Sequence, residues 1–350
     1  MTAAPRLRVG INGFGRIGRA ITRINLERKA FDLVAINDIN PDVENVRYLL
    51  RYDSTYGRLR SEVAVDGRDL VFNGAADRAT VYGENSVSNV PWDEHGVDVV
   101  IDASGVDDNL VALPKLADHG VRHCIVTSSP DSGRVDKSVI VGVNEQTLGR
   151  HDFVISSSIC DAAAFVSVMY LLEQAYGIEY GSLTTLHPWL SYQSLLDGPS
   201  FTYANVNPGY TLGRASPMSL IPKTSSCVQA SSQIMPGIDE KFISVSYRVP
   251  TMIVSAADVV VKLPRPVTRN EVIELFEDAE RKQRYSIIQN NHEPLVSIDF
   301  IGSEYSAIVD HRWTAVQGSG QLKLVIWYDN EWGYSSRVVD LVTHLASLHA

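Results

Sequence analysis

Near its N-terminus the chain reads VGINGFGRIG from Val9 to Gly18, and this stretch determines how the first domain folds. Apolar residues alternate with other residues from Leu7 to Ile11, which is the two-residue period of a β-strand. Isoleucines then recur at helical spacing from Ile17 to Ile24. The chain is therefore predicted to pass from strand to helix at the glycines.

Gly13, Gly15 and Gly18 form the pattern G-x-G-x-x-G at this turn. The first glycine permits the turn, the second lets the backbone approach a pyrophosphate, and the third lets helix and strand pack closely. Asp38 follows the next apolar run, 20 residues after Gly18 (38 − 18). An acid there accepts hydrogen bonds from the ribose 2′-hydroxyl and repels a 2′-phosphate. We therefore predict an NAD site that favours NAD over NADP.

Further apolar runs of strand length alternate with helical or loop segments in the first half of the chain. These runs are Phe31–Ile36, Val97–Ile101, Val121–Val126 and Phe153–Ile155, with Asn109–Asp118 among the segments between them. Strands that alternate with helices are typical of a mostly parallel, doubly wound sheet. We expect an α/β fold with a Rossmann NAD-binding domain over residues 1–159.

The pattern changes after Cys160. Residues Ala162–Tyr176 predict a buried helix, and a capping box of Thr268 and Glu271 predicts the start of another. The predicted strands are Ser182–His187, Ile243–Val249, Ala257–Leu263, Leu295–Phe300 and Leu322–Tyr328. Consecutive strands with few crossover helices favour an antiparallel sheet. We expect an α+β domain over residues 160–330, and a C-terminal helix within 331–350 that packs back on the first domain and completes it.

Composition limits the class of protein. With 350 residues, of which 45% are hydrophobic and 21% charged, the chain can form two ordinary globular domains. Its net charge of −10 argues against nucleic acid or an anionic membrane as the main partner. Three cysteines, Cys124, Cys160 and Cys227, do not make a disulfide framework, and no run approaches the ~18 apolar residues of a membrane span. We expect a soluble, cytoplasmic protein that binds neither nucleic acid nor membrane.

Cys160 and His187 form the most reactive pair that the sequence suggests. Cys160 opens the predicted helix after the run Ser156–Ile159, and His187 ends a predicted strand. A cysteine at a helix N-terminus lies at the positive end of the helix dipole, which favours a thiolate near neutral pH. A thiolate beside an imidazole is a nucleophile with its base. An isolated cysteine is more often an inert core side chain, so the case for catalysis depends on the rest of the chain.

Several longer motifs resemble the glyceraldehyde-3-phosphate dehydrogenase family, and they span nearly the whole chain. Besides the glycine-rich stretch they are ND at 37–38, YDSTYGR at 52–58, VGVNE at 141–145, TTLH at 184–187, RVPT at 248–251 and WYDNEWGYS at 327–335. The runs AYGIE at 175–179 and SAIVD at 306–310 are closer to the erythrose-4-phosphate dehydrogenase branch.

The resemblance implies NAD-dependent oxidation of an aldehyde through a thioester, with Cys160 as nucleophile and His187 as base. It implies that Asn330 holds the nicotinamide carboxamide and that Arg248 faces a substrate or attacking anion. It also implies a homotetramer built partly by the loop after His187. The default substrate by resemblance is glyceraldehyde 3-phosphate or erythrose 4-phosphate, a small phosphorylated sugar aldehyde.

The sequence departs from the family where anions are expected to bind. The family's nucleophile usually sits in SCTTNC, whereas Asp161 and three alanines follow Cys160 here. The carboxylate either fills the site of the attacking anion, which would disfavour phosphate, or only occupies the first turn of its helix, where an acid is favourable. Leu190 stands where the family has a hydroxyl in H-x-x-T, and only Arg214 remains of an arginine-rich segment.

The segment Gly198–Ser219 has three prolines and no periodicity, which predicts a long functional loop. Its aromatic residues Phe201, Tyr203 and Tyr210 either pack between subunits or contact the substrate.

The candidate site residues fall into three groups. Cofactor binding is assigned to Gly13, Phe14, Gly15, Arg16, Ile17, Gly18, Asp38, Ser104, Gly105, Thr127, Asn330 and Tyr334. Catalysis is assigned to Cys160 and His187, and substrate binding to Asp161, Arg214, Ser225 and Arg248; we expect no metal ion. Two alternatives stay open: the same chemistry on a non-phosphorylated or otherwise acidic aldehyde with hydrolytic release of a free acid, and a non-catalytic NAD-binding scaffold.

Overall fold

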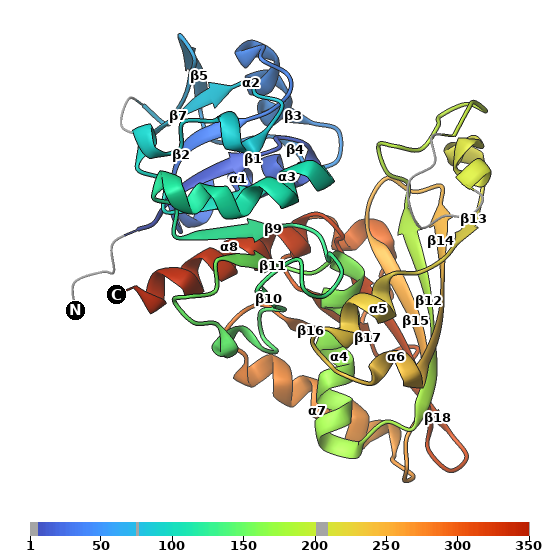
Figure 1. The fold of residues 1–350 in the computed structure, drawn as a ribbon. Helices are drawn as coiled ribbons and strands as arrows, with labels where there is room; N and C mark the ends of the chain where they lie inside the picture. The colour runs from blue at the N-terminus through green and yellow to red at the C-terminus, as the bar shows by residue number, and fades with distance from the viewer. Residues whose placement is uncertain (1–5, 75–76, 201–208, 350) are drawn as a thin grey trace. The chain divides into compact units, whose positions relative to one another are not determined.

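The structure is a computed structural model that describes residues 6–74, 77–200 and 209–349 (Figure 1). The chain divides into two compact units. The first comprises Met1–Ile159 with Ser335–Ala350, and the second is Cys160–Tyr334.

The first unit is built on a nine-stranded sheet with the order β10-β11-β9-β8-β1-β2-β7-β6-β5. Its strands are β1 (Arg8–Asn12), β2 (Asp32–Asn37), β5 (Val63–Asp66), β6 (Asp69–Phe72), β7 (Asp77–Tyr82), β8 (Val99–Asp102), β9 (His123–Val126), β10 (Lys137–Ser138) and β11 (Val154–Ser156). Pairing is parallel from β10 to β7, and antiparallel where β5, β6 and β7 meet. The predicted doubly wound sheet is confirmed, with an antiparallel edge of three strands that the sequence analysis did not predict.

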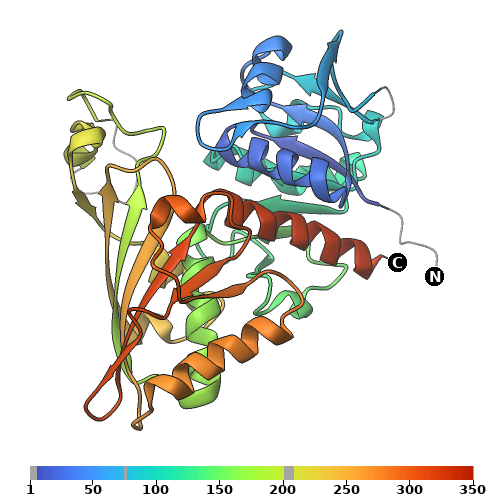
Figure 2. The same ribbon diagram turned by 180° about the vertical axis from the view of Figure 1, so that it is seen from behind.

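Helices cover both faces of this sheet. They are α1 (Arg16–Arg28), α2 (Val43–Arg51), α3 (Asp107–Ala112) with the 3-10 helix η3 (Leu113–His119), and the C-terminal part of α8 (Trp332–Leu348). α3 lies in front of the sheet in Figure 1, and α1 and α8 lie in front of it in Figure 2, which shows the opposite side. Arg28 at the end of α1 pairs with Asp340 of α8 across 2.9 Å, which ties the last helix to this unit.

The core of this unit lies between the sheet and α3. Trp92 is fully buried there, and its indole N–H donates to the carbonyl of Val87 across 2.8 Å. Val100 and Cys124 contribute from β8 and β9, and Leu113 packs from η3. Burial of such side chains stabilises the layer by roughly 1.5–3 kcal/mol each.

The second unit is built on an eight-stranded sheet with the order β13-β14-β12-β15-β19-β17-β16, and β18 pairs with β19. Its strands are β12 (Tyr180–Pro188), β13 (Ile221–Lys223), β14 (Phe242–Val249), β15 (Ser255–Lys262), β16 (Ile288–Asn291), β17 (Ala307–Asp310), β18 (Ala315–Gln317) and β19 (Gln321–Tyr328). The sheet is mixed, because β12 pairs parallel with β14 and β16 parallel with β17, while the other pairs are antiparallel. The α+β class of this unit agrees with the prediction. The prediction of an antiparallel sheet is wrong for two pairs, because the chain crosses over between β12 and β14 and between β16 and β17.

Helices α4 (Cys160–Tyr176), α5 (Cys227–Ser232), α6 (Ile238–Lys241) and α7 (Arg269–Lys282) belong to the second unit. They lie on one face of its sheet (Figure 1). The capping box predicted at the start of α7 is confirmed, since Thr268 accepts from the N–H of Glu271 and the Glu271 carboxylate accepts from the N–H of Thr268. The short helices α5 and α6 were not predicted.

The predicted strand Leu295–Phe300 is wrong. Residues Ser297–Phe300 form a 3-10 helix, η7. The carboxylate of Asp299 accepts from the backbone N–H of Val296 across 2.8 Å, and the N–H of Asp299 donates to the Val296 carbonyl. A short acidic side chain that bonds to nearby backbone in this way favours a turn over an extended strand.

The long loop contains two short 3-10 helices, η5 (Gly209–Gly213) and η6 (Ser216–Met218). Tyr210 is exposed there. Phe201 and Tyr203 lie outside the described residues. Within the described ranges, no helix is both long enough and apolar enough to cross a bilayer.

Candidate active site

The glycine-rich turn joins β1 to α1 as predicted. Gly13 has φ +91°, and a Cβ there would lie 2.5 Å from the backbone nitrogen of Ser104. A Cβ on Gly18 would lie 2.3 Å from the carbonyl oxygen of Gly13. By contrast, a Cβ on Gly15 would meet no atom of the described residues within 4 Å, its two chain neighbours aside. The first and third glycines are thus required by the protein's own backbone, and the second leaves open space at a helix N-terminus, which fits a pyrophosphate.

Asp38 lies directly beside this turn. Its carboxylate accepts from the backbone N–H of Phe14 across 2.7 Å and from that of Asn40 across 2.9 Å. These two bonds fix the carboxylate at the carboxyl end of β2, where a ribose is expected to lie in such folds. The position fits the role that the sequence predicts for Asp38.

Buried amides and a carboxylate hold the carboxyl ends of three strands together. Asn37 of β2 donates to Asn12 of β1 across 2.8 Å, and Asn12 donates to Asp102 of β8 across 2.8 Å. Burial raises the pKa of Asp102. The hydroxyl of Ser104 also donates to Asp102, across 2.7 Å. This network makes the cofactor side of the sheet rigid.

The remaining cofactor candidates of this unit have different surroundings. Gly105 and Thr127 line a cavity of about 240 Å³ at the carboxyl ends of β8 and β9. Arg16 instead forms an ion pair with Asp53, and its guanidinium lies over the ring of Tyr56. The Arg16 side chain is therefore occupied by protein partners, while its backbone opens α1. Phe14 is buried and Ile17 is half-buried.

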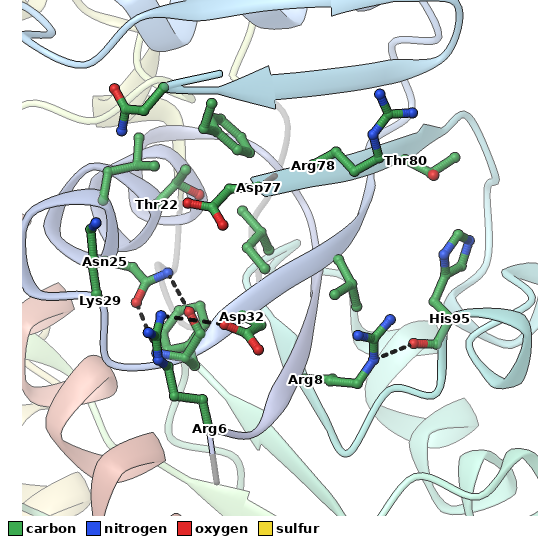
Figure 3. A pocket seen from close by; sticks show the side chains of 16 residues that line it. Arg6, Arg8, Thr22, Asn25, Lys29, Asp32, Asp77, Arg78, Thr80 and His95 are labelled. Carbon is green, nitrogen blue, oxygen red and sulfur yellow. Dashed lines mark hydrogen bonds and ion pairs between the residues drawn. The ribbon is translucent and has the colours of Figure 1, made fainter. Parts of the chain in front are cut away.

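Another cavity, of about 460 Å³, lies at the opposite, amino ends of the strands (Figure 3). Two arginines on its wall are already paired: Arg6 with Asp32 across 3.5 Å, and Arg8 with the carbonyl of His95 across 2.8 Å. Ligands of open α/β sheets bind at the carboxyl ends of the strands. We therefore place no functional site in this cavity.

Cys160 and His187 come together in the second unit. Ser158, with φ +60°, turns the chain after β11, and Cys160 is the first residue of α4. His187 shares the inward face of β12 with buried Leu183 and Thr185. Its Nε2 lies 3.7 Å from the Cys160 sulfur. Its Nδ1–H donates to the carbonyl of Pro188 across 2.7 Å, since a carbonyl can only accept, and this bond leaves Nε2 unprotonated and directed at the thiol.

Asp161 points into the same site. Its Oδ1 accepts from the Cys160 thiol across 3.5 Å and lies 3.8 Å from Nε2 of His187. The hydroxyl of Tyr328 on β19 donates to the same oxygen across 2.9 Å. The carboxylate therefore does more than favour the first turn of α4: it contacts both members of the predicted catalytic pair.

These contacts keep the pair neutral. Burial, and then the Asp161 carboxylate, raise the pKa of the Cys160 thiol well above its usual range. Burial, and then the positive charge of Arg248, lower the pKa of His187 to about 4. In this arrangement burial, and then the Asp161 carboxylate, oppose the thiolate that the N-terminus of α4 favours. The site holds a thiol beside a neutral imidazole, which is an available base.

Two cations lie near this pair. Arg248 on β14 is buried, its guanidinium donates to the Tyr192 hydroxyl across 2.9 Å, and its Nε has no partner among the described residues. Burial, and then Arg248, lower the pKa of Lys223, whose ammonium donates to the carbonyl of Thr224. No carboxylate of the described residues pairs with either side chain. A buried guanidinium without a carboxylate fits an anionic ligand.

The other candidates of this unit are less directly involved. Asn330 is buried, and its Oδ1 has no partner in the described part of the chain, so it can accept a bond from an amide of a ligand. Tyr334 is buried on α8. Arg214 is exposed and pairs with Asp197 across 3.2 Å. Ser225 accepts from the N–H of Cys227 across 3.2 Å at the start of α5. Arg214 and Ser225 are not shown in contact with Cys160 or His187.

Sequence reasoning missed Tyr328 and Tyr192. Tyr328 lies within a quoted motif and ends a correctly predicted strand, so its proximity to Asp161 could have been suspected only once the order of the strands was known. Tyr192 follows the HPWL segment and gave no signal.

Comparisons with known proteins show the family of the chain. Residues 7–109 match the family described as glyceraldehyde 3-phosphate dehydrogenase, NAD binding domain, and residues 159–330 match glyceraldehyde 3-phosphate dehydrogenase, C-terminal domain. The chain is 34% identical over 340 residues to glyceraldehyde-3-phosphate dehydrogenase 1 of Kluyveromyces lactis, covering 97% of this chain and 100% of that protein. It is 33% identical to glyceraldehyde-3-phosphate dehydrogenase 3 of Saccharomyces cerevisiae, covering 97% and 99%. The resemblance drawn from the motifs and the prediction of NAD as cofactor are confirmed.

Proposed function

The chain belongs to the glyceraldehyde-3-phosphate dehydrogenase family and is an NAD-dependent oxidoreductase, and we propose that it oxidises a small anionic aldehyde through a thioester on Cys160. The observation that carries the proposal is the 3.7 Å approach of the Cys160 sulfur to Nε2 of His187, with the tautomer fixed by Pro188. A scaffold that only bound NAD would need neither the pair nor this tautomer.

The chain's own residues supply the proton transfers. Nε2 of His187 takes the thiol proton as the sulfur bonds to the aldehyde carbon, and the resulting imidazolium donates to the oxygen that was the carbonyl. NAD, when bound, would supply the hydride acceptor. As the hydride leaves that carbon, the hydroxyl proton would return to Nε2 of His187 and the thioester carbonyl would form. The glycine-rich turn and Asp38 would hold the pyrophosphate and ribose, and Asn330 would accept a bond from the carboxamide.

Arg248 and Lys223 define the class of substrate. Two cations and one carboxylate, Asp161, share the site, so the excess positive charge would attract an anionic group of the substrate. A phosphorylated sugar aldehyde carries such a group, and so does an aldehyde acid. We favour the phosphorylated aldehyde, because the relatives are named glyceraldehyde-3-phosphate dehydrogenases.

Asp161 favours water as the second nucleophile. Its Oδ1 lies 3.5 Å from the sulfur that would carry the acyl group, and two unit charges 4 Å apart repel by roughly 4 kcal/mol at an effective dielectric constant of about 20. An attacking phosphate would meet this repulsion, whereas water would not, and the carboxylate can take a proton from water. Attack then breaks the C–S bond, returns the proton to the sulfur and releases a free acid.

The decisive experiment follows NADH formation by the purified protein with a panel of phosphorylated, carboxylated and neutral aldehydes, with and without phosphate. We expect turnover of an anionic aldehyde in phosphate-free buffer and a free acid as product. The variant Asp161→Thr should acquire phosphate dependence and form some acyl phosphate. A wild-type enzyme that is silent without phosphate would refute hydrolytic release, and silence with every aldehyde under both conditions would refute the oxidation itself.

We further propose a homotetramer in the cytoplasm. The outer face of the second sheet exposes Leu186 and Ile243, the latter 77% exposed, which supports a subunit contact there. Cys124, Cys160 and Cys227 are all free thiols, which fits a reducing compartment. Size-exclusion chromatography with light scattering measures the mass of the assembly, and we expect Ile243→Lys to dissociate the tetramer. Cell fractionation tests whether the protein lies in the cytoplasm.

A further inference from the structure

Three different ligand atoms converge at the start of α4. The Cys160 sulfur, Oδ1 of Asp161 and Nε2 of His187 all lie within 4.8 Å of one another. The sulfur is 3.5 Å from the oxygen and 3.7 Å from the nitrogen, and the oxygen and nitrogen are 3.8 Å apart. They therefore form a nearly equilateral triangle.

This triangle has the size of one face of a zinc coordination tetrahedron. Zn²⁺ binds sulfur at about 2.3 Å and nitrogen or oxygen at about 2.0–2.2 Å, which separates the ligand atoms by about 3.3–3.6 Å in a tetrahedron. One side of the triangle, 3.5 Å, already falls in that range, and the other two exceed it by a few tenths of an ångström. Small rotations of the side chains would close the difference.

The partners of the three side chains prepare them as ligands. The bond from Nδ1 of His187 to the Pro188 carbonyl leaves the lone pair of Nε2 facing the triangle. The hydroxyl of Tyr328 orients the Asp161 carboxylate. Outer hydrogen bonds of this kind are what hold histidine and carboxylate ligands in place in metal sites.

We propose that Cys160, Asp161 and His187 form a three-ligand site for Zn²⁺ that reversibly masks the nucleophile. Zn²⁺ replaces the thiol proton, which passes to solvent as the S–Zn bond forms, and a fourth position stays open to water. The thiolate and the carboxylate together neutralise the ion, which Arg248 and Lys223 would otherwise oppose. Asp161 is therefore essential to the site. The proposal rests on the proposed function only in calling Cys160 the nucleophile.

The sequence contains no short metal-binding motif at these residues, since Cys160 and His187 are 27 residues apart. Thiolate and imidazole favour Zn²⁺ over Mg²⁺ or Ca²⁺, which prefer oxygen ligands. Mg²⁺ is therefore not expected to compete.

The test is a titration of the chelator-treated, full-length protein with Co²⁺, which reports geometry through its absorption, followed by displacement with Zn²⁺. We expect one Co²⁺ per chain, the visible bands of a tetrahedral ion and a thiolate charge-transfer band in the near ultraviolet. Cys160→Ala should abolish the charge-transfer band, whereas Cys124→Ala, the matched control at a buried thiol of the other unit, should keep it. Tyr328→Phe should weaken binding by about 10–100-fold, and Asp161→Ala by more.

Two outcomes overturn the proposal: no stoichiometric Co²⁺ or Zn²⁺ binding, or binding of equal strength in wild type and Asp161→Ala. The absorption does not depend on turnover, so this result is separate from the aldehyde panel. If the metal-free enzyme is inactive with every aldehyde, the proposed function is refuted, and the absorption of bound Co²⁺ still tests the metal site. If the metal-free enzyme is active, Zn²⁺ should inhibit turnover, and a chelator should restore the activity.

Discussion

The hydroxyl of Tyr328 donates to Oδ1 of Asp161 across 2.9 Å, and the same oxygen accepts from the Cys160 thiol. Burial, and then Asp161, raise the pKa of Tyr328 well above its usual range, so the phenol stays protonated and keeps donating. A strand of the sheet thereby fixes the carboxylate that contacts the proposed nucleophile.

Removing the charge of Asp161 should make Cys160 more reactive. In Asp161→Asn the pH midpoint of Cys160 alkylation by iodoacetamide should fall by about one to two units, because a neighbouring negative charge no longer opposes the thiolate. Mass spectrometry of the labelled peptide over a pH series measures this midpoint. Tyr328→Phe is the matched control: it removes the hydrogen bond but keeps the charge, so its midpoint should not fall. Equal midpoints in Asp161→Asn and wild type would contradict the effect of the carboxylate.

Cys160→Ser should abolish turnover, by about 10⁴-fold or more, because an alcohol is a far weaker nucleophile than a thiol. NAD affinity, measured by calorimetry, should stay nearly unchanged, since the cofactor residues of the glycine-rich turn are untouched. In the wild type, Cys160 should be alkylated before Cys124 and Cys227, which are fully buried. Near-wild-type activity in Cys160→Ser, or faster labelling of another cysteine, would contradict the assignment of Cys160 as the nucleophile.

Asp38→Ala should narrow the preference for NAD over NADP. In the proposed placement of the ribose, the wild-type carboxylate would repel a 2′-phosphate. A repulsion of only about 1.4 kcal/mol would change the affinity for the cofactor tenfold. We expect the ratio of kcat/KM for the two cofactors to shift by at least about tenfold toward NADP. Asp42→Ala, which alters a helix cap a few residues away, serves as the control. Equal use of both cofactors by the wild type would contradict this placement of Asp38.

Arg248→Met should weaken binding of an anionic aldehyde. A hydrogen bond to a charged group contributes about 1.5–3 kcal/mol, so KM should rise by roughly 10–100-fold. Arg214→Met is the matched control, because Arg214 is exposed and paired with Asp197. The measurement is KM for an anionic and a neutral aldehyde with each variant. A similar rise for both substrates in Arg248→Met would argue for a structural role instead.

Stability should fall in mild acid because two histidines are buried in the neutral form. Burial lowers the pKa of His187 and of His311 from the ordinary 6.5 to about 4. The unfolded chain takes up protons at these imidazoles below about pH 6.5, whereas the folded chain does not until about pH 4. The free energy of unfolding should therefore decrease as the pH falls between these values, by up to about 3 kcal/mol for each group.

Urea denaturation at pH 7 and pH 5 measures this decrease. His311→Gln should reduce the difference between the two pH values. His151→Gln, at a largely exposed histidine, should leave the difference unchanged. A wild-type midpoint that does not move with pH would contradict the burial of these neutral imidazoles.

The sequence predicted best where the structure depends on local chemistry. Close backbone contacts require glycine at positions 13 and 18, and Thr268 and Glu271 cap a helix within four residues. The glycine-rich turn and the capping box could therefore be predicted from the sequence alone. The strand predicted at Leu295–Phe300 is wrong because a single side chain, Asp299, bonds to the backbone and forms a turn despite the apolar pattern. The contact between Tyr328 and Asp161 could not be predicted, since it depends on which strands lie side by side. For the same reason the direction of the Asp161 side chain stayed open.

The chain passes between its two compact units at Ile159–Cys160 and again at Tyr334–Ser335. A recombination that exchanged the glycine-rich unit for that of a relative would have its first crossover at the nucleophile itself. Such a chimera keeps Cys160 and His187 from one parent but takes Ser158, whose backbone turns the chain toward the thiol, from the other. Asp38, the proposed determinant of cofactor preference, and the proposed catalytic pair would then come from different parents, which must be compatible in the residues just before Cys160.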